Sequence, residues 1–301
     1  MEFWIPLSIA AGFLQNLRSA LQKHLTGKLS TSGAAYARFI YALPFVTLYL
    51  LALMQLGNDP LPAPNSRFLL YCTLGGICQI LFTVFLLWLF SFKSFAVGTS
   101  YSKLEVLMVA VLGAVVLGDT LSPPAVVAIA FASLGVVALS IGRQSISVAA
   151  FLSGFFHRST LIGLVCAVWL GASVVFFRGA TLALETDTVL MAAAYALTVS
   201  LLIQSAVMGV YLRWREPGEL TRVLQQWRWA GAAGLAGALA SMAWFTAFTL
   251  QNASYVRAVG QVELIFTFLA GVFFFREQVS RLEIAGIVLI GSSIVMLLLF
   301  G

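Results

Sequence analysis

The chain has 301 residues, of which 61% are hydrophobic and only 9% are charged. Soluble domains are about half apolar and about a quarter charged, so this composition excludes a soluble globular protein and predicts a protein solvated by lipid. The formal net charge of +6 belongs mainly to short segments between apolar stretches, so it requires no nucleic-acid partner.

Ten apolar stretches follow one another along the chain, each long enough to cross a bilayer as a helix. They are continuously apolar, whereas membrane-spanning β-strands would alternate polar and apolar residues, so helices are predicted. The stretches cover residues 3–22, 33–56, 67–91, 95–117, 122–142, 159–182, 187–212, 229–250, 253–275 and 281–300. The predicted fold class is an all-α integral membrane protein with ten transmembrane helices.

Lysine and arginine are unevenly distributed over the segments between these stretches. The segments after the first, third, fifth, seventh and ninth stretches hold or border eleven of them, and the alternate segments hold only Arg67. Positively charged loops stay in the cytoplasm, so this count predicts a multi-pass protein with both termini outside. The expected location is the bacterial inner membrane.

Cysteine and histidine offer no basis for a metal site or a catalytic centre. Cys72, Cys78 and Cys166 lie in apolar stretches without a C-x-x-C spacing, and His24 and His157 lie in polar segments. No reactive pair, zinc motif or phosphate-binding glycine loop is present in the sequence. We therefore expect no cofactor and no enzymatic activity.

An internal repeat is visible when residues 94–139 are laid over residues 252–297, a shift of 158 positions without a gap. The coinciding polar positions are Glu105 with Glu263, Gly113 with Gly271, Asp119 with Glu277, and Ser122 with Ser280. Five spans per repeat would make the second repeat cross the membrane in the opposite sense. Residues 1–150 and 151–301 are thus predicted to be two inverted five-helix repeats, a construction common in secondary transporters.

Three segments resemble EamA-like members of the drug/metabolite transporter superfamily. They are REQVSRLEIAGIVLIG at residues 276–291, LGDTLSPPAVVAIAFASLG at residues 117–135, and AYARF at residues 35–39, which has an arginine early in the second span. The resemblance implies two inverted halves around a central cavity, and export or exchange of amino acids, related metabolites or toxic small molecules. Two features differ from the family pattern: Asp119 replaces the usual glutamate, and the loop charges place the termini outside.

Glu105 and Glu263 are the strongest candidates for a functional role. Each lies ten residues into its stretch, or about 15 Å along a helix, which corresponds to the middle of the membrane. An ionised group at that depth normally faces a cavity or a partner, so each glutamate is predicted to bind a proton or a cationic group. The alternative is a structural pair with a basic residue that fastens two helices.

Further polar and aromatic side chains lie inside the stretches and are candidates for substrate binding or coupling. They are Lys103, Arg257, Gln261, Tyr101, Gln15, Asn16, Gln79, Trp88, Trp169 and Trp244. The cations would bind a carboxylate or a phosphate, and the aromatic rings would suit an apolar or cationic substrate. The alternatives are an internal ion pair for the lysine, an interfacial position for the arginine, hydrogen bonds between helices for the amides, and packing for the tryptophans.

The predicted function is secondary transport of a small metabolite, as an exporter or exchanger, by alternating access. Basic residues outnumber acidic ones inside the stretches, which favours amino acids or other anionic or zwitterionic compounds. The site is expected between the first, third, fourth, sixth, eighth and ninth stretches. A proton-coupled exporter of cationic drugs and a lipid-handling membrane protein are the alternatives. Expected partners are the substrate, membrane lipid and, for a coupled mechanism, protons; both a monomer and a homodimer are compatible with the sequence.

Overall fold

The computed structural model describes residues 2–25, 28–57, 60–90, 101–143, 149, 158–273 and 279–300. This part of the chain is almost entirely α-helical and contains no β-strand, which confirms the predicted all-α class. Within it, seven helices are long and apolar enough to cross a membrane. The chain is thus a multi-pass integral membrane protein, whereas ten spans and an inverted repeat stay predictions.

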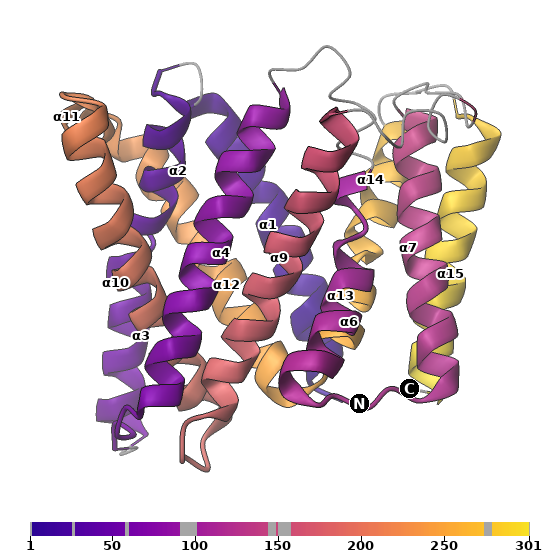
Figure 1. Cartoon of the computed structure of the whole chain (residues 1–301), viewed down its shortest axis with the longest axis horizontal. Helices are drawn as coiled ribbons and strands as arrows, with labels where there is room; N and C mark the ends of the chain where they lie inside the picture. Colours follow the sequence, from indigo (N-terminus) through magenta and orange to yellow (C-terminus); the bar gives the residue numbers. More distant parts are fainter. Residues whose placement is uncertain are drawn as a thin grey trace. The chain divides into compact units, whose positions relative to one another are not determined.

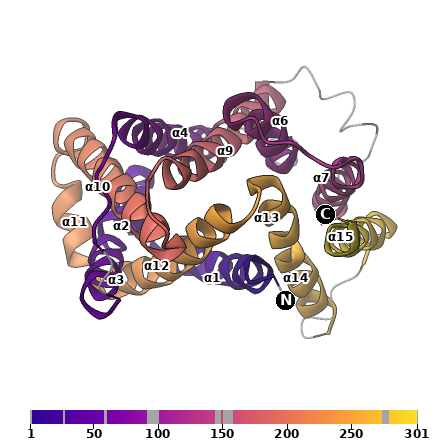
Figure 2. The same cartoon turned by 90° about the horizontal axis from the view of Figure 1, so that it is seen from below.

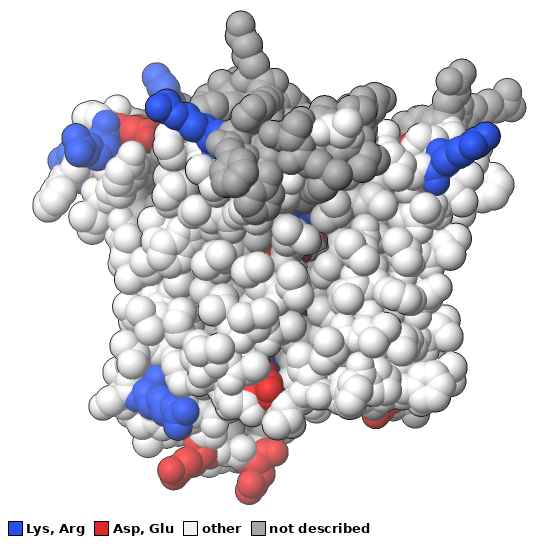
Figure 3. All heavy atoms as spheres, turned by 45° about the vertical axis from the view of Figure 1, so that its right-hand side comes forward, with Lys and Arg blue, Asp and Glu red and all other residues white. Residues whose placement is uncertain are grey.

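The helices follow the apolar stretches along the chain (Figure 1). They are α1 (Trp4–Leu25), α2 (Thr31–Ile40), α3 (Leu43–Leu56), α4 (Ser66–Phe90), α6 (Glu105–Leu117), α7 (Pro123–Arg143), α9 (Arg158–Leu182), α10 (Val189–Arg215), α11 (Glu219–Gln225), α12 (Trp227–Leu250), α13 (Ala253–Gly260), α14 (Val262–Phe273) and α15 (Arg281–Phe300). On the face drawn in Figure 3, a broad white band with few charged atoms separates charged side chains near the upper and lower margins. Such a band suits helices whose flanks contact lipid.

The chain forms two compact units. Unit 1 contains Met1–Ile80 and Phe176–Gln251, and unit 2 contains Leu81–Val175 and Asn252–Gly301. Helices α4 and α9 each continue from one unit into the other. Each unit draws on both parts of the sequence, so this division in space differs from the predicted repeats 1–150 and 151–301, which stay a prediction.

In unit 1, α12 packs along α1 and also contacts α10, α2 and α3 (Figure 2). Two glycines of α12 make this approach possible. A Cβ at Gly234 would lie 2.5 Å from the backbone carbon of Tyr41, and one at Gly237 would lie 3.1 Å from Cδ of Arg18. Small residues let helix backbones approach closely in lipid, where apolar surface itself provides little driving force.

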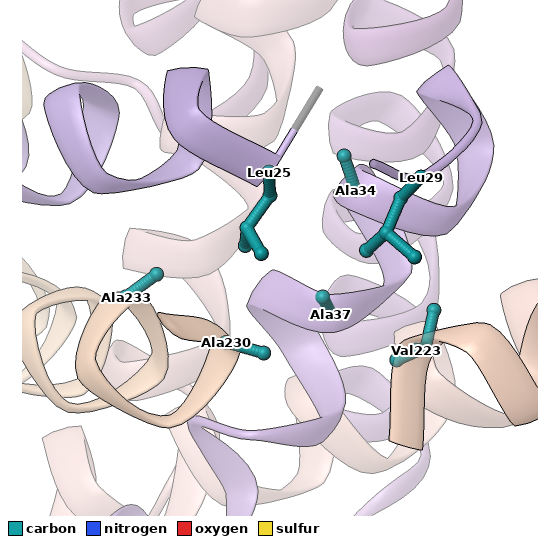
Figure 4. Close-up of a cluster of buried hydrophobic side chains, with 7 residues drawn as sticks. All are labelled: Leu25, Leu29, Ala34, Ala37, Val223, Ala230 and Ala233. Atoms are coloured by element: carbon teal, nitrogen blue, oxygen red, sulfur yellow. The ribbon is translucent and has the colours of Figure 1, made fainter. Parts of the chain in front are cut away.

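Near one end of unit 1, small and aliphatic side chains from α1, α2, α11 and α12 form a buried cluster (Figure 4). Its members are Leu25, Leu29, Ala34, Ala37, Val223, Ala230 and Ala233. The cluster joins the loop between α1 and α2 to the short helix α11. It therefore fixes α11 against the end of the unit.

In unit 2, the principal packing is between α7 and α15, which lie side by side in Figures 1 and 2. Gly135 of α7 and Gly286 of α15 face each other at the contact. A Cβ on Gly135 would lie 2.8 Å from the carbonyl oxygen of Gly286, and one on Gly286 would lie 2.7 Å from that of Gly135. No side chain larger than hydrogen fits at either position without moving a helix.

The stretch predicted as a helix over 33–56 lies in one of the seven candidate spans, Thr31–Leu56, but a turn divides it into α2 and α3. Pro44 is at the second position of α3. Proline has no backbone N–H and therefore cannot donate the helical hydrogen bond to the carbonyl four residues before it, which explains why α2 ends and a new helix begins here.

The predicted helix over 253–275 is also divided, between α13 and α14. Gly260 is the last residue of α13, and the N–H of Gln261 bonds to the carbonyls of Ala258 and Val259 in a tightened final turn. Glycine has low helix propensity, and such tight turns are frequent at helix ends. Hydropathy alone does not reveal the division, since both pieces are apolar.

Candidate functional site

Both candidate glutamates lie directly after an interruption in their helices. Glu105 is the first residue of α6, behind a turn at Lys103 and Leu104, and Glu263 is the second residue of α14. A turn therefore interrupts the helix directly before each glutamate, whereas the predicted depth of the glutamates in the membrane stays a prediction. The first N–H groups of a helix have no partner within it, and its dipole favours negative charge there. Each carboxylate is thus close to the N-terminus of a helix.

Glu105 forms a buried ion pair with a residue of a different helix. Nη2 of Arg257, in α13, donates to Oε1 of Glu105, and α13 packs against α6. Arg257 is 8% exposed and Glu105 is 6% exposed, so water reaches neither side chain freely. Arg257 thus does not merely extend to the membrane surface, which was one of the two interpretations of its position.

Two further charges act on this pair from within unit 2. Glu263 attracts both Lys103 and Arg257, while these two cations repel each other. We call Lys103, Glu105, Arg257 and Glu263 the charged cluster. The cluster contains two acids and two bases close to the two helix interruptions in the sequence, so its formal charges balance.

The members of the charged cluster differ in accessibility. Lys103 is exposed, whereas Glu105 and Arg257 are buried. Of its neighbours among the predicted site residues, Tyr101 is 4% exposed and Gln261 is 7% exposed. Nε2 of Gln261 donates to the carbonyl oxygen of Arg257 at 3.3 Å, which closes the last turn of α13 beneath the arginine.

In unit 1, two of the predicted site residues meet. Nε1 of Trp244 in α12 donates to Oε1 of Gln15 in α1 at 3.2 Å, and the indole stacks on Phe248 with ring centroids 5.5 Å apart. Trp244 is buried, while Asn16, next to Gln15, is exposed. A polar contact of this kind fastens two membrane helices whether or not it also contacts a ligand.

Gln79 has a partner that the sequence interpretation missed. Nε2 of Gln204, in α10, donates to Oε1 of Gln79 at 2.7 Å, and Gln204 is only 1% exposed. The sequence signal for this partner was Gln204 itself, a single amide in the middle of an otherwise apolar stretch. Such a residue must find a hydrogen bond inside the protein, because lipid offers none.

The remaining tryptophans take different positions. Trp88 is 53% exposed in α4 and lies 6.0 Å from the ring of Phe85, whereas Trp169 is half-buried in α9.

Arg178 donates from Nε to the carbonyl oxygen of Phe248 at 3.1 Å, close to the end of α12. A cation near the last carbonyls of a helix complements the dipole there, which explains this arginine structurally.

Comparisons with known proteins bear on the second part of the chain and on the fold. Residues 157–299 match the model of the EamA-like transporter family. None of the curated proteins matches the chain. One solved structure, described only as the crystal structure of a protein, has a TM-score of 0.66 at 16% identity, and the match covers 98% of this chain and 97% of that chain. At this identity the likeness establishes the fold alone. Residues 157–299 are therefore similar to the EamA-like transporter family, part of the drug/metabolite transporter superfamily.

Proposed function

We propose that this protein is a secondary transporter that exports or exchanges a small metabolite by alternating access. The proposed substrates are amino acids or other anionic or zwitterionic compounds, and the proposed location is the bacterial inner membrane. The observation that carries the proposal is the charged cluster at the interruptions before α6 and α14.

The first supporting argument is energetic. An ionised side chain inside a bilayer costs at least about 2.5–3.5 kcal/mol unless it meets a partner or water. Breaking a buried ion pair by removing one member is unfavourable by about 3–5 kcal/mol. A zwitterion avoids this penalty because its carboxylate can take the place of Glu105 beside Arg257 while its ammonium group meets a glutamate.

The second argument concerns net charge. The four members of the charged cluster sum to zero when all are ionised, and a zwitterion adds no net charge. A carrier of this kind changes conformation without moving net charge through the membrane field in either the empty or the loaded state. An anionic substrate would meet the same condition by entering together with a proton.

The third argument is the correspondence between the two parts of the sequence. Helix α7 begins at Pro123 and α15 begins at Arg281, a shift of 158 positions, which is the shift that aligns Glu105 with Glu263. Helix interruptions at corresponding positions of a repeat are typical of transporter substrate sites. On this basis we propose ten spans in two inverted five-helix repeats, residues 1–150 and 151–301.

The cations of the cluster do not follow the repeat. At the same shift, Lys103 corresponds to Gln261, and Arg257 corresponds to Thr99. Two repeated acids are therefore combined with two cations, each present in only one repeat. Each cation thus corresponds to an uncharged residue in the other repeat, and the cluster holds both signs of charge, as recognition of a zwitterion requires.

The test is uptake and counterflow of labelled amino acids, anionic metabolites and a lipophilic cation in proteoliposomes, with and without a pH gradient. Native protein is compared with Glu105→Gln and Glu263→Gln, and with Glu185→Gln as a matched control at an exposed glutamate outside the cluster. We expect zwitterion or anion flux that a cluster variant abolishes or uncouples from the pH gradient and that the control retains.

Two results would count against the proposal. Normal transport by both cluster variants would mean that the buried carboxylates are structural. Movement of the lipophilic cation alone, driven by the pH gradient, would identify a proton-coupled exporter of cationic drugs instead.

A further inference from the structure

A short surface segment at one end of unit 1 combines arginine and tryptophan on both sides of α11. The sequence reads Arg213-Trp214-Arg215 at the end of α10 and Trp227-Arg228-Trp229 at the start of α12. All six side chains are exposed, and Trp214 reaches 80% exposure. We call these six residues the arginine–tryptophan surface.

The backbone between the two triplets is tightly held. Gly218, with φ of 89°, turns the chain from α10 into α11 in a conformation that favours glycine. Oε1 of Glu219 accepts from the backbone N–H of Ser30 at 2.5 Å, and Oε2 of Glu216 accepts from Oγ of Ser30 at 2.5 Å. The buried side chain of Val223 joins the hydrophobic cluster drawn in Figure 4.

These contacts turn the inner side of α11 toward the protein and leave an apolar residue outside. Leu224 is 65% exposed, and its own carbonyl oxygen accepts a weak hydrogen bond from Oη of Tyr41 at 3.5 Å. Figure 1 places α11 beside the end of α10. An exposed leucine between two exposed triplets that contain tryptophan favours the interface between water and the hydrocarbon core of a membrane.

The charges of the segment favour an anionic neighbour. Both acidic residues of the connection, Glu216 and Glu219, are already engaged with Ser30, and Glu219 also pairs with Arg222 at 3.3 Å. Arg213, Arg215 and Arg228 thus face outward as cations, and Arg228 lies 5.3 Å from the ring of Trp227. Guanidinium groups bind phosphate oxygens in a bidentate manner, and indole rings prefer the headgroup level of a membrane.

We propose that the arginine–tryptophan surface binds the headgroups of anionic phospholipids in the adjoining leaflet. Arginine supplies the contacts to the phosphodiester, tryptophan lies at the boundary of headgroup and acyl chain, and Leu224 enters the acyl region. The fixed attachment of α11 to the loop between α1 and α2 holds the two triplets in place for this contact.

The test supplies the purified protein with equal amounts of phosphatidylglycerol or phosphatidylcholine. Native mass spectra then measure how much of each lipid the protein retains. The test variant is Arg213→Gln/Arg215→Gln/Arg228→Gln, and the control is Arg67→Gln, which removes an exposed arginine near the opposite end of unit 1. Each arginine at a membrane surface contributes about fivefold to binding of anionic lipid. We expect native protein and the control to prefer phosphatidylglycerol and the triple variant to lose at least about tenfold of that preference.

Two further arms separate the possible outcomes. Soluble glycerol phosphate is added as a competitor, and displacement of lipid by it at equal concentration would identify a site for free anions and overturn the proposal. An unchanged preference in the triple variant would also overturn it. If the triple variant is not recovered in folded form, the Arg213→Gln/Arg215→Gln variant is used. Its loss of preference for phosphatidylglycerol is expected to be smaller, because two arginines are removed in place of three.

Discussion

Glu105 in unit 2 and Glu219 in unit 1 are buried to almost the same extent, at 6% and 4% exposure, yet they are satisfied in different ways. Glu219 accepts a backbone N–H bond from Ser30 and pairs with Arg222, whose side chain is 69% exposed. Glu105 pairs with Arg257, which is itself buried. The first carboxylate fixes a loop at the end of the unit, where water reaches its partner.

The second carboxylate has no such support from solvent. Its partner comes from another helix, and the charges of Lys103 and Glu263 act on the pair. Burial of the acid alone therefore does not distinguish a structural role from a functional one. The accessibility of the partner and the helix that supplies it distinguish the two roles. A ligand can take the place of a partner only where that partner is not needed to hold the helices together.

The largest effect is expected from removing one member of the buried pair. Arg257→Gln leaves the Glu105 carboxylate without its cation, and we expect a loss of about 3–5 kcal/mol in the free energy of unfolding together with loss of transport. Thermal unfolding in detergent and counterflow in proteoliposomes measure the two effects. The double variant Arg257→Gln/Glu105→Gln should recover much of the stability but not the transport. Equal stability of the single and double variants would contradict the pairing.

A smaller effect is expected from widening the contact between α7 and α15. Gly286→Ala places a Cβ against the carbonyl oxygen of Gly135, and we expect a loss of about 1–3 kcal/mol from overpacking. Gly291→Ala in the same helix is the matched control, because a Cβ there meets nothing within 4 Å. Thermal unfolding of the two variants side by side checks the difference, and similar midpoints would show that the two helices do not pack as described.

Glu219→Gln tests the structural half of the comparison. The amide can still accept from the N–H of Ser30 but loses the ion pair with Arg222, and a pair with a partner that is 69% exposed contributes at most about 1 kcal/mol. We expect a loss of stability in that range with the substrate flux per folded protein unchanged. A drop in flux without a drop in stability would assign Glu219 to the transport mechanism and remove the distinction drawn between it and Glu105.

The smallest effect is expected at the contact between α1 and α12. Trp244→Phe retains the ring but removes the donor to Gln15, and hydrogen bonds between membrane helices contribute about 0.6 kcal/mol on average. Unfolding measured by intrinsic fluorescence or circular dichroism should shift only slightly. A strong loss of transport at near-native stability would indicate that the indole also contacts the substrate.

Much of the architecture was predictable from the sequence, although the site geometry was not. The apolar stretches could be located because hydropathy is a sum over neighbouring residues. They could be interpreted as helices because a segment that crosses lipid must form all of its backbone hydrogen bonds within itself. The interruption before α3 had a local signal in Pro44, but the interruption at Gln261 had only the weak signal of Gly260. The segment that contains Glu277 and Gln278, on which part of the resemblance rests, lies outside the described residues.

The sequence by itself determined that this protein resides in a membrane, that it is helical, and that two glutamates occupy corresponding positions. Composition and a single alignment of the chain with itself suffice for these conclusions. Only the tertiary structure decided that Arg257 pairs with Glu105, that Gln204 pairs with Gln79, and that Gly135 faces Gly286. The partners in each pair are at least 125 positions apart in the sequence, so their contacts depend on how the helices pack and have no local signal.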